Sequence, residues 1–500
     1  MARARAFQLT LLPLAAAALV AIDGCSGSGG LGVEDPADAG PHAEIETPPE
    51  PPPPGPRADA SAPDAQEDAP AADAGEDASE DATSDAGDAS VDAGADVDSG
   101  PPPGPLSPTY VDYDVNHVLV TGQSNSVANG GTPVLTTAQP YTNVMFNTGV
   151  MPISQCDGDG CKNYQTPASL SPLVEGDRFF GYMVETPSAG LANEISKLAI
   201  DRFEFGTRPG YPQKHDVLVS VSGRSGNTYW CLRKGSCSFM DGRGYVKPYD
   251  QAILDATNGK ARAQALGKTY AVRAVATIHG ESDHYYNQFP LPGTDGTPNK
   301  IKNYSDGLLE WQADLEKDIK AITGQAQPIP LFVSGLSGWN NVVTSPIPVH
   351  QLDAHVRAPG KVVLIGPTYM LPVKNDCLHF DAHGSRRLGE YFAKVYARVV
   401  LAGQPWEPVR PMQITRAGNV VTVKYHVPKP PLVLDTTRVT NPGDFGFQFL
   451  DDSGSTPAIT SVAVTARDTV TITLAATPTG AKKSLRYALK QNPNTCIGPG

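Results

Sequence analysis

The chain has 500 residues, of which 40% are hydrophobic, and its formal net charge is -14. This length and apolar content allow more than one folded domain and exclude a wholly disordered or collagen-like protein. Residues 31–107 hold 20 acidic residues and one basic residue, whereas residues 108–500 hold 36 basic and 32 acidic residues. A body so close to neutral gives no electrostatic argument for nucleic acid, which needs a basic patch or stripe, and we therefore expect no nucleic-acid partner.

Residues 1–25 have the pattern of a secretory signal, in which two arginines precede an apolar run from Phe7 to Ile22. The run is shorter than the roughly 20 residues that cross a bilayer. Its end, Ile22-Asp23-Gly24-Cys25, resembles the lipobox of bacterial lipoproteins. The resemblance implies that Cys25 is lipidated and anchors the protein to a membrane, at the outer membrane or cell surface. The alternative is a secreted or periplasmic protein without lipid.

Residues 26–108 are rich in proline and in Asp-Ala repeats and contain almost no bulky apolar side chains. Such a segment cannot bury enough surface to offset the entropy of ordering it, so we predict a disordered linker. Its like charges and prolines favour an extended spacer. Calcium binding by the aspartates is a weaker hypothesis, because no regular Gly/Asp period supplies a fixed geometry.

The segment 109–404 contains five short, continuously apolar runs separated by helical patterns. Continuous apolar runs are typical of parallel strands that are covered on both faces. The predicted strands are 117–121, 216–221, 271–277, 330–334 and 361–365. The predicted helices are about 187–202, 248–266, 303–323 and 385–401. This alternation predicts a three-layer α/β/α sandwich around a doubly wound sheet.

Polar clusters follow four of the five predicted strands, at the edge where ligands bind in such sheets. They are Gly122–Asn125, Ser222–Thr228, His279–His284 and Asn375–Gly384. Each cluster alone is typical of an ordinary turn, a glycine loop or a helix start. Together they place potential catalytic groups at one edge of the sheet.

The clusters contain the groups that acyl transfer requires. Ser124 lies on a turn after the first strand, although not in a G-x-S-x-G elbow. The spacing Asp376-x-x-His379 allows one loop to carry a base and the carboxylate that orients it. A metal site made by His379, His383 and nearby aspartates is the competing interpretation, but no other cluster supplies an obvious third ligand. We therefore expect neither a metal nor another cofactor.

The four motifs GQSN (122–125), GNT (226–228), HGESD (279–283) and DCLH (376–379) resemble those of the SGNH/GDSL hydrolases. The closest resemblance is to the branch of sialate O-acetylesterases and of acetyl xylan esterases from carbohydrate esterase family six. It covers most of residues 115–400. It implies a flavodoxin-like parallel sheet and a serine esterase that removes acetyl groups from carbohydrate. The alternatives are a general short-chain esterase or lipase, and an inactive carbohydrate-binding surface protein.

The resemblance also implies roles for individual residues. Ser124 would be the nucleophile, His379 the general base and Asp376 its orienting carboxylate. The oxyanion hole would use the backbone N–H of Ser124 and of Gly226, or of Gly223 if the loop register is shifted. These positions follow the family motifs one by one.

Three further side chains are candidates for contacts with the substrate: Gln123, Asn227 and Glu281. Where the related branch carries glutamine, this chain has His279, which we expect to act as a further oxyanion donor if its imidazole is neutral. Glu281 is assigned no chemical step, because the motif fits a structural or orienting role equally well.

Six cysteines remain beside Cys25, and export permits disulfides. Spacing predicts the local pairs Cys156–Cys161 and Cys231–Cys237, which leaves Cys377–Cys496 by elimination. Sequence alone leaves other connectivities open.

After the Pro-rich join at 403–408, the hydrophobic period changes to two. Apolar residues alternate with polar ones in 421–427 and again in 470–474. This pattern predicts a small antiparallel β-sandwich over 405–500. Accessory modules of this kind either contact carbohydrate or serve for packing and spacing, and both interpretations stay open.

Overall fold

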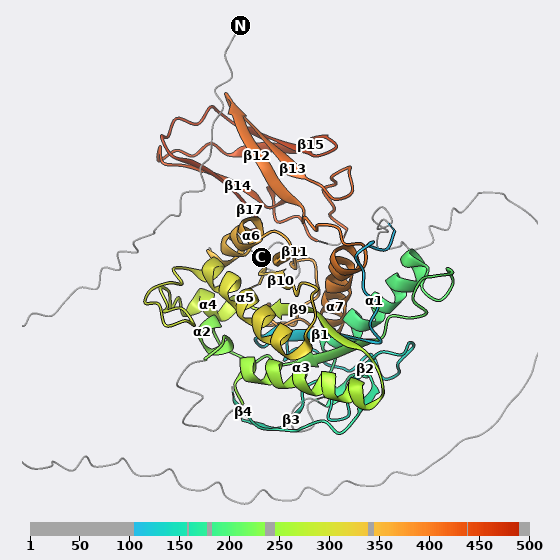
Figure 1. Cartoon of the computed structure of the whole chain (residues 1–500). Coiled ribbons are helices and arrows are strands. Elements are labelled where there is room, and N and C mark those ends of the chain that lie inside the picture. Colours follow the sequence, from blue (N-terminus) through green and yellow to red (C-terminus); the bar gives the residue numbers. More distant parts are fainter. Residues whose placement is uncertain are drawn as a thin grey trace, which may run out of the picture. The chain divides into compact units, whose positions relative to one another are not determined.

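The computed structural model describes residues 105–489, apart from 158–159, 178–182, 236–245, 339–344 and 438. Strands and helices alternate first, and a group of strands follows (Figure 1). The predicted signal peptide, Cys25 and most of the predicted linker lie outside the described residues, as do Cys237 and Cys496. Within the described ranges, no helix is both long and apolar enough to cross a membrane.

A seven-stranded sheet forms the centre of the first part, with the order β11-β10-β9-β1-β8-β2-β5. Neighbouring strands from β11 to β2 are parallel, and only β5 runs antiparallel. The bounds are β1 Val115–Gly122, β2 Val144–Phe146, β5 Leu170–Pro172, β8 Val217–Val221, β9 Tyr270–Ile278, β10 Leu331–Gly335 and β11 Val362–Pro367. The five predicted strands correspond to β1, β8, β9, β10 and β11, and their order is the flavodoxin-like one.

The strand interiors show why these apolar runs are continuous. Every residue of β1, β8 and β9 is buried. Successive side chains of a strand point to opposite faces. Val118 and Val120 therefore enter one hydrophobic core, and Leu119 enters the other. Both faces of the sheet are covered, as the sequence predicted.

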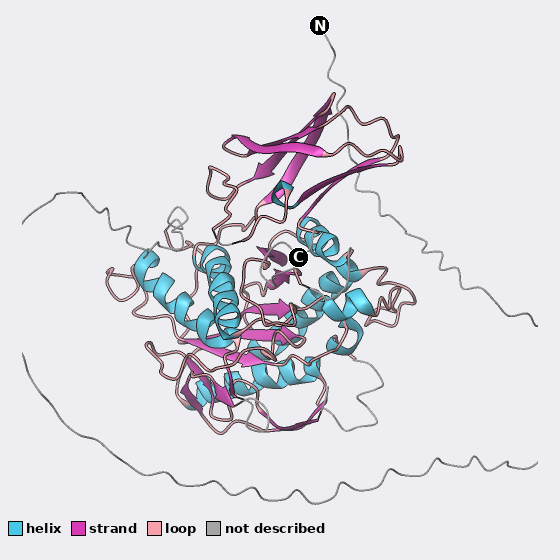
Figure 2. Ribbon diagram, turned by 180° about the vertical axis from the view of Figure 1, so that it is seen from behind, coloured by secondary structure: helices cyan, strands magenta, loops and turns pink. Residues whose placement is uncertain are grey.

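Helices form the two outer layers and lie on either side of the strands in Figure 2. Side chains of α1 and α7 share the core that contains Val118, whereas those of α3, α5 and α6 share the core that contains Leu119. The bounds are α1 Pro187–Phe203, α3 Pro248–Ala265, α5 Tyr304–Thr323, α6 Ile347–Arg357 and α7 Ala382–Tyr396. The predicted three-layer sandwich is confirmed, and α6 is an addition that the sequence analysis missed.

Local capping explains where two of these helices begin. The side chain of Asn303 accepts a hydrogen bond from the N–H of Asp306 at the start of α5, and Gly324 ends that helix with φ 72°. The side chain of Asp381 accepts from the N–H of Gly384 at the start of α7. This cap starts α7 three residues earlier than predicted. The helix continues as a π-helical segment, Ala397–Leu401.

The C-terminal module has two antiparallel sheets that share one core. The larger sheet has the order β12-β13-β16-β15, and β14 pairs with β17 in the smaller one. The bounds are β12 Arg410–Ala417, β13 Val420–His426, β14 Phe447–Asp451, β15 Ile459–Ala466, β16 Thr469–Leu474 and β17 Lys483–Tyr487. Val421 and Ile472 from the larger sheet pack with Phe447 and Phe449 from the smaller one. The predicted β-sandwich is therefore present.

Two short hairpins lie between β2 and α1 in the chain. One pairs β3 (Ile153–Asp157) with β4 (Gly160–Tyr164), and its register sets Cys156 opposite Cys161. The other pairs β6 (Gly176–Asp177) with β7 (Met183–Val184). The register agrees with the expected local pair, although the two cysteine side chains lie outside the described atoms. Cys231 and Cys377 are both disulfide-bonded, and their expected partners lie outside the described residues.

Candidate active site

The nucleophile candidate lies just beyond the carboxyl end of β1. Gly122, the last residue of β1, has φ +133°, and a Cβ at this position would collide with the carbonyl group of Ile278 at the end of β9. Glycine therefore lets the turn pack directly against the neighbouring strand. Ser124 follows on this turn with 7% of its surface exposed. The turn holds its hydroxyl at the sheet edge where ligands bind.

Ser124, His379 and Asp376 form a continuous hydrogen-bonded chain. The Nε2 atom of His379 lies 2.9 Å from Ser124 Oγ, and its Nδ1 atom lies 2.7 Å from Asp376 Oδ2. An ionised carboxylate only accepts hydrogen bonds, so Nδ1 carries a proton and the neutral ring presents the Nε2 lone pair to the hydroxyl. In this geometry, His379 can take the serine proton.

Asp376 is held by the backbone of its own loop. Its Oδ1 atom accepts hydrogen bonds from the N–H groups of Leu378, at 3.0 Å, and of His379, at 2.9 Å. Burial favours a higher pKa for Asp376, but the hydrogen bonds from His379 and Leu378 outweigh it, and the pKa falls below its ordinary value. The carboxylate is therefore ionised at neutral pH and can stabilise a protonated imidazole.

The two ends of the loop that carries Asp376 and His379 are paired with each other. The N–H of Lys374 donates to the carbonyl oxygen of His379 at 2.8 Å, and Val373 pairs with Phe380. Cys377 adopts φ +56°, a conformation that is uncommon for a residue other than glycine, and its sulfur is in a disulfide. A closed loop of this kind fixes the short spacing between the base and its carboxylate.

The glycine loop after β8 lies beside the serine turn. The side-chain N–H of Asn129 donates to Ser225 Oγ at 2.8 Å, which joins the two segments. Gly223 has no room for a Cβ because Ser126 and Gly122 pack against it, and Gly226 adopts φ +68°. The loop is therefore shaped by glycines, as expected, and both candidate N–H donors, Gly223 and Gly226, belong to it.

A buried arginine holds the same loop through hydrogen bonds to backbone carbonyl groups. The sequence analysis did not identify it. Arg224 is 2% exposed, and its guanidinium donates to the carbonyl oxygens of Ser222, Gly223 and Val246 and to Gln251 Oε1. Burial lowers the pKa of Arg224 to about 10, so it is still charged at neutral pH. An arginine between two glycines reads as a surface loop residue, which is why sequence alone gave no signal.

His279 is not placed as an oxyanion donor, and that prediction is corrected. It is 1% exposed, and burial lowers its pKa to about 4, so the ring is neutral and has a single N–H. Its Nε2 atom lies 3.0 Å from the carbonyl oxygen of Asn227, and its Nδ1 atom lies 2.8 Å from the hydroxyl of Tyr304. The single N–H therefore serves Asn227, and His279 supports the glycine loop instead.

The three candidates for substrate contacts are largely buried. Gln123 accepts hydrogen bonds through Oε1 from the N–H groups of Ser282 and Gly280. The side chain of Asn227 donates to the carbonyl oxygen of Ser225 at 2.8 Å. Glu281 accepts from the side chain of Asn125 at 3.0 Å. The contacts of Gln123 and Glu281 connect the serine turn to the segment after β9, whereas that of Asn227 lies within the glycine loop.

The groups considered for a metal site do not assemble in the described part of the chain. There, no cluster of three or more His, Cys, Asp and Glu side chains has the arrangement of a metal site. His379 is engaged with Ser124 and Asp376, whereas His383 is exposed on the first turn of α7.

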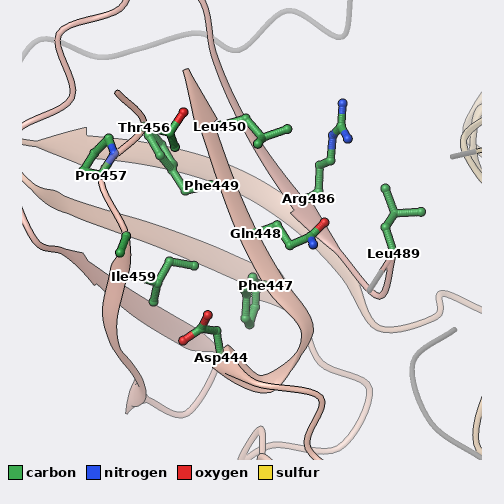
Figure 3. Close-up of a pocket in the computed structure, with 11 residues that line it drawn as sticks. Asp444, Phe447, Gln448, Phe449, Leu450, Thr456, Pro457, Ile459, Arg486 and Leu489 are labelled. Carbon is green, nitrogen blue, oxygen red and sulfur yellow. The ribbon is translucent and has the colours of Figure 1, made fainter. Parts of the chain in front are cut away.

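A separate pocket of about 560 Å³ occurs in the C-terminal module (Figure 3). Its lining runs from Asp444 to Leu489 and includes Phe447, Ile459 and Arg486. None of the candidate active-site residues lines it. Phe447 and Phe449 are almost fully buried, so neither offers an exposed ring face.

Comparison with known proteins finds matches among solved structures at low sequence identity. No protein-family model matches the sequence, and no curated protein matches it. A carbohydrate acetylesterase from Xanthomonas citri has a TM-score of 0.47 at 13% identity, with 76% of each chain covered. An Arabidopsis thaliana protein has a TM-score of 0.33 at 14% identity, and the match covers 56% of this chain and 97% of that one.

A carbohydrate acetylesterase from Sinorhizobium meliloti has a TM-score of 0.28 at 12% identity, and the match covers 57% of this chain and 99% of that one. The fold of this chain is evident from its own strands and helices. Its chemistry follows from its own side chains.

Proposed function

We propose that this chain is a serine esterase that removes acetyl groups from carbohydrate by a two-step acyl-transfer mechanism. The observation that carries the proposal is the hydrogen-bonded chain from Ser124 through His379 to Asp376 at the carboxyl edge of the sheet. The resemblance of the four motifs to carbohydrate O-acetylesterases supports acetyl groups on sugars as the substrate class. We further propose that lipid on Cys25 anchors the enzyme to a membrane.

Each residue of the hydrogen-bonded chain has its own role in the proposed reaction. Ser124 Oγ attacks the ester carbonyl while His379 Nε2 takes its proton, and Asp376 stabilises the imidazolium that forms. The N–H groups of Ser124 and Gly226 would hold the tetrahedral oxyanion, and each such donor contributes about 3 kcal/mol. His379 then returns the proton to the leaving sugar oxygen. Water releases acetate by the same steps.

The test compares the hydrolysis of p-nitrophenyl acetate, butyrate and octanoate by the full chain, with Ser124→Ala as the reference. We expect turnover of acetate that is lost in Ser124→Ala, and release of acetate from an acetylated polysaccharide such as acetyl xylan. Turnover that increases with chain length would favour a lipase-like esterase instead. A folded protein without serine-dependent turnover on any of these esters would contradict the proposal and favour an inactive carbohydrate-binding protein.

A further inference from the structure

The residue after the candidate nucleophile connects its turn to the loop of the candidate base. Asn125 is 2% exposed, and its Nδ2 atom donates to the carbonyl oxygen of Leu378 at 3.2 Å. Its Oδ1 atom accepts from the N–H of Phe380 at 3.1 Å. Leu378 and Phe380 are the two neighbours of His379 in the chain. One amide group therefore holds the backbone on both sides of the base.

This bonding pattern requires an amide at position 125. The Nδ2 atom also donates to Glu281 Oε1 at 3.0 Å, so it faces two oxygens while Oδ1 faces an N–H. An aspartate has the same shape but no donor, and its carboxylate would face both oxygens. The side chain thus acts like a peptide unit paired with the 378–380 segment.

Glu281 fixes the amide from the opposite side. It is the first residue of α4 (Glu281–Tyr285) and is 7% exposed, and its Oε2 atom has no hydrogen-bond partner among the described residues. Burial raises the pKa of Glu281, although the hydrogen bond from Asn125 and the charge of His379 oppose this. Burying a carboxyl group with one oxygen unpaired is costly.

The start of α4 is itself held in place. The N–H of Ser282 donates to Gln123 Oε1 at 3.1 Å, and Asp283 Oδ2 accepts from the N–H of Tyr229 at 2.8 Å. Glu281 is therefore anchored to both neighbouring loops. The result is a continuous path from α4 through Asn125 to the backbone around His379.

We propose that Asn125 is a positioning residue that sets His379 against Ser124, and that Glu281 orients Asn125 by accepting its amide proton. The proposal rests on the esterase function argued above. It assigns no chemical step to either side chain. If the proposal is correct, kcat depends on which side-chain atoms donate and accept hydrogen bonds at positions 125 and 281. It does not depend on the charge at position 281.

Variants at position 125 test the amide. Asn125→Asp and Asn125→Ala should each lower kcat for p-nitrophenyl acetate by about 100-fold, as expected for a displacement of about 1 Å at the base. KM should change by less than about threefold, because the proposed role affects the reaction step and not the binding of the ground state. A kcat near that of the wild type in both variants would overturn the proposal.

Variants at position 281 separate hydrogen bonding from charge. Glu281→Gln keeps an oxygen acceptor for Asn125, so it should lose clearly less kcat than Glu281→Met, which should lose about tenfold. The effects of Glu281→Met and Asn125→Ala should be clearly less than additive, because both break one path. If Glu281→Gln is as slow as Glu281→Met, the carboxylate charge matters and the positioning role of Glu281 is wrong.

Asn143 supplies a matched control for stability. It is 1% exposed, and its amide makes three hydrogen bonds, with Asn193, Ser196 and the N–H of Val217. Asn143→Asp should lower the melting temperature about as much as Asn125→Asp without lowering kcat. A fall in kcat of similar size in both variants would mean that general destabilisation explains the loss.

The labelling rate of Ser124 with a fluorophosphonate distinguishes a failure of the positioning role from a failure of the proposed esterase function. A fluorophosphonate reports the reactivity of the serine without any ester substrate. If the wild type is labelled but hydrolyses no acetyl ester, the proposed function fails while the positioning role can still be measured. Labelling of Asn125→Asp at the wild-type rate would overturn the positioning role alone.

Discussion

Asp376 shows how much a single residue contributes to the site. It accepts hydrogen bonds from the imidazole of His379 and from two backbone N–H groups of its own loop. Its pKa is lowered, so the carboxylate stays ionised as the pH falls and becomes protonated only below the ordinary aspartate range. The Asp376 carboxylate is therefore available to orient the imidazole of His379 throughout the neutral and mildly acidic range.

Replacing Asp376 by Asn should lower kcat for p-nitrophenyl acetate by about 10⁴-fold, because an amide can hold the imidazole in the wrong tautomer. The measurement is steady-state kinetics from pH 5 to 9, with circular dichroism as the check on folding. A loss of less than about tenfold in a folded variant would contradict the orienting role of Asp376.

Among the residues of the candidate site, some could be predicted from the sequence and their neighbours could not. Ser124 could be named as a candidate because it directly follows an apolar strand, and Asp376 and His379 because of their Asp-x-x-His spacing in the polar cluster after the last strand, since strand ends meet at one edge. Asn125 and Arg224 could not, because their importance lies in contacts with Leu378, Glu281 and Val246 that are distant in sequence. His279 was misassigned because its burial between Asn227 and Tyr304 depends on tertiary packing.

At the scale of elements, the sheet was predictable where its strands are long and covered on both faces. Strands β2 and β5 have three residues each, which is too short for a hydrophobic period to appear. Helix α6 was missed because Pro346 and Pro348 at its start resemble a loop signal, although proline is compatible with a first helical turn. The burial of polar side chains on α3, such as Asp255, could not be predicted from the sequence either.

Asp255 on α3 allows a test of pH-dependent stability. It is fully buried and accepts a hydrogen bond from the hydroxyl of Tyr164 at 2.8 Å. Burial raises its pKa to about 7, although the hydrogen bonds to it oppose this. Because the unfolded value is about 4, the folded state binds the extra proton between about pH 4 and 7, and stability falls as the pH rises through that range.

Asp255→Asn should therefore flatten this decline, and at pH 8 its free energy of unfolding should exceed that of the wild type by on the order of 1–3 kcal/mol. Urea unfolding at pH 5 and pH 8 measures both values. Parallel pH profiles for the two proteins would show that Asp255 does not titrate in this range.

At the scale of the whole molecule, the described residues form separate hydrophobic cores along the chain. The two cores on the faces of the parallel sheet draw on residues up to Ala402 and on Trp406, and the core of the C-terminal module begins at Ile414. The indole N–H of Trp406 donates to the carbonyl oxygen of Ile365 in β11 at 3.1 Å. The proline-rich join is thus the expected place to divide the chain.

We predict that a chain ending after Pro408 retains Ser124-dependent hydrolysis of p-nitrophenyl acetate within about threefold, because no core residue of the catalytic part is removed. A chain ending after Gln404 should be less stable because it lacks Trp406. Equal melting temperatures for the two truncations would contradict the role of Trp406, and loss of activity in the longer one would contradict the boundary.

Anchoring through Cys25 makes a prediction about the full-length protein. Wild-type protein from a bacterial host should partition into the detergent phase on Triton X-114 separation, and Cys25→Ser should move it to the aqueous phase, because a lipid chain contributes about 0.8 kcal/mol per buried methylene. Identical partition of both proteins would indicate secretion without lipid.

The chain positions of Ser124 and of the Asp376–His379 loop impose an order on assembly. A ribosome that has made the chain through β11 has produced the serine and all seven strands of the central sheet, but neither the base nor its carboxylate. Domains generally fold as units, and N-terminal domains fold first during synthesis. An unfinished or broken chain that ends before Asp376 therefore contains Ser124 but lacks the proposed base and its carboxylate. The working site arises late, after the scaffold that holds it has been made.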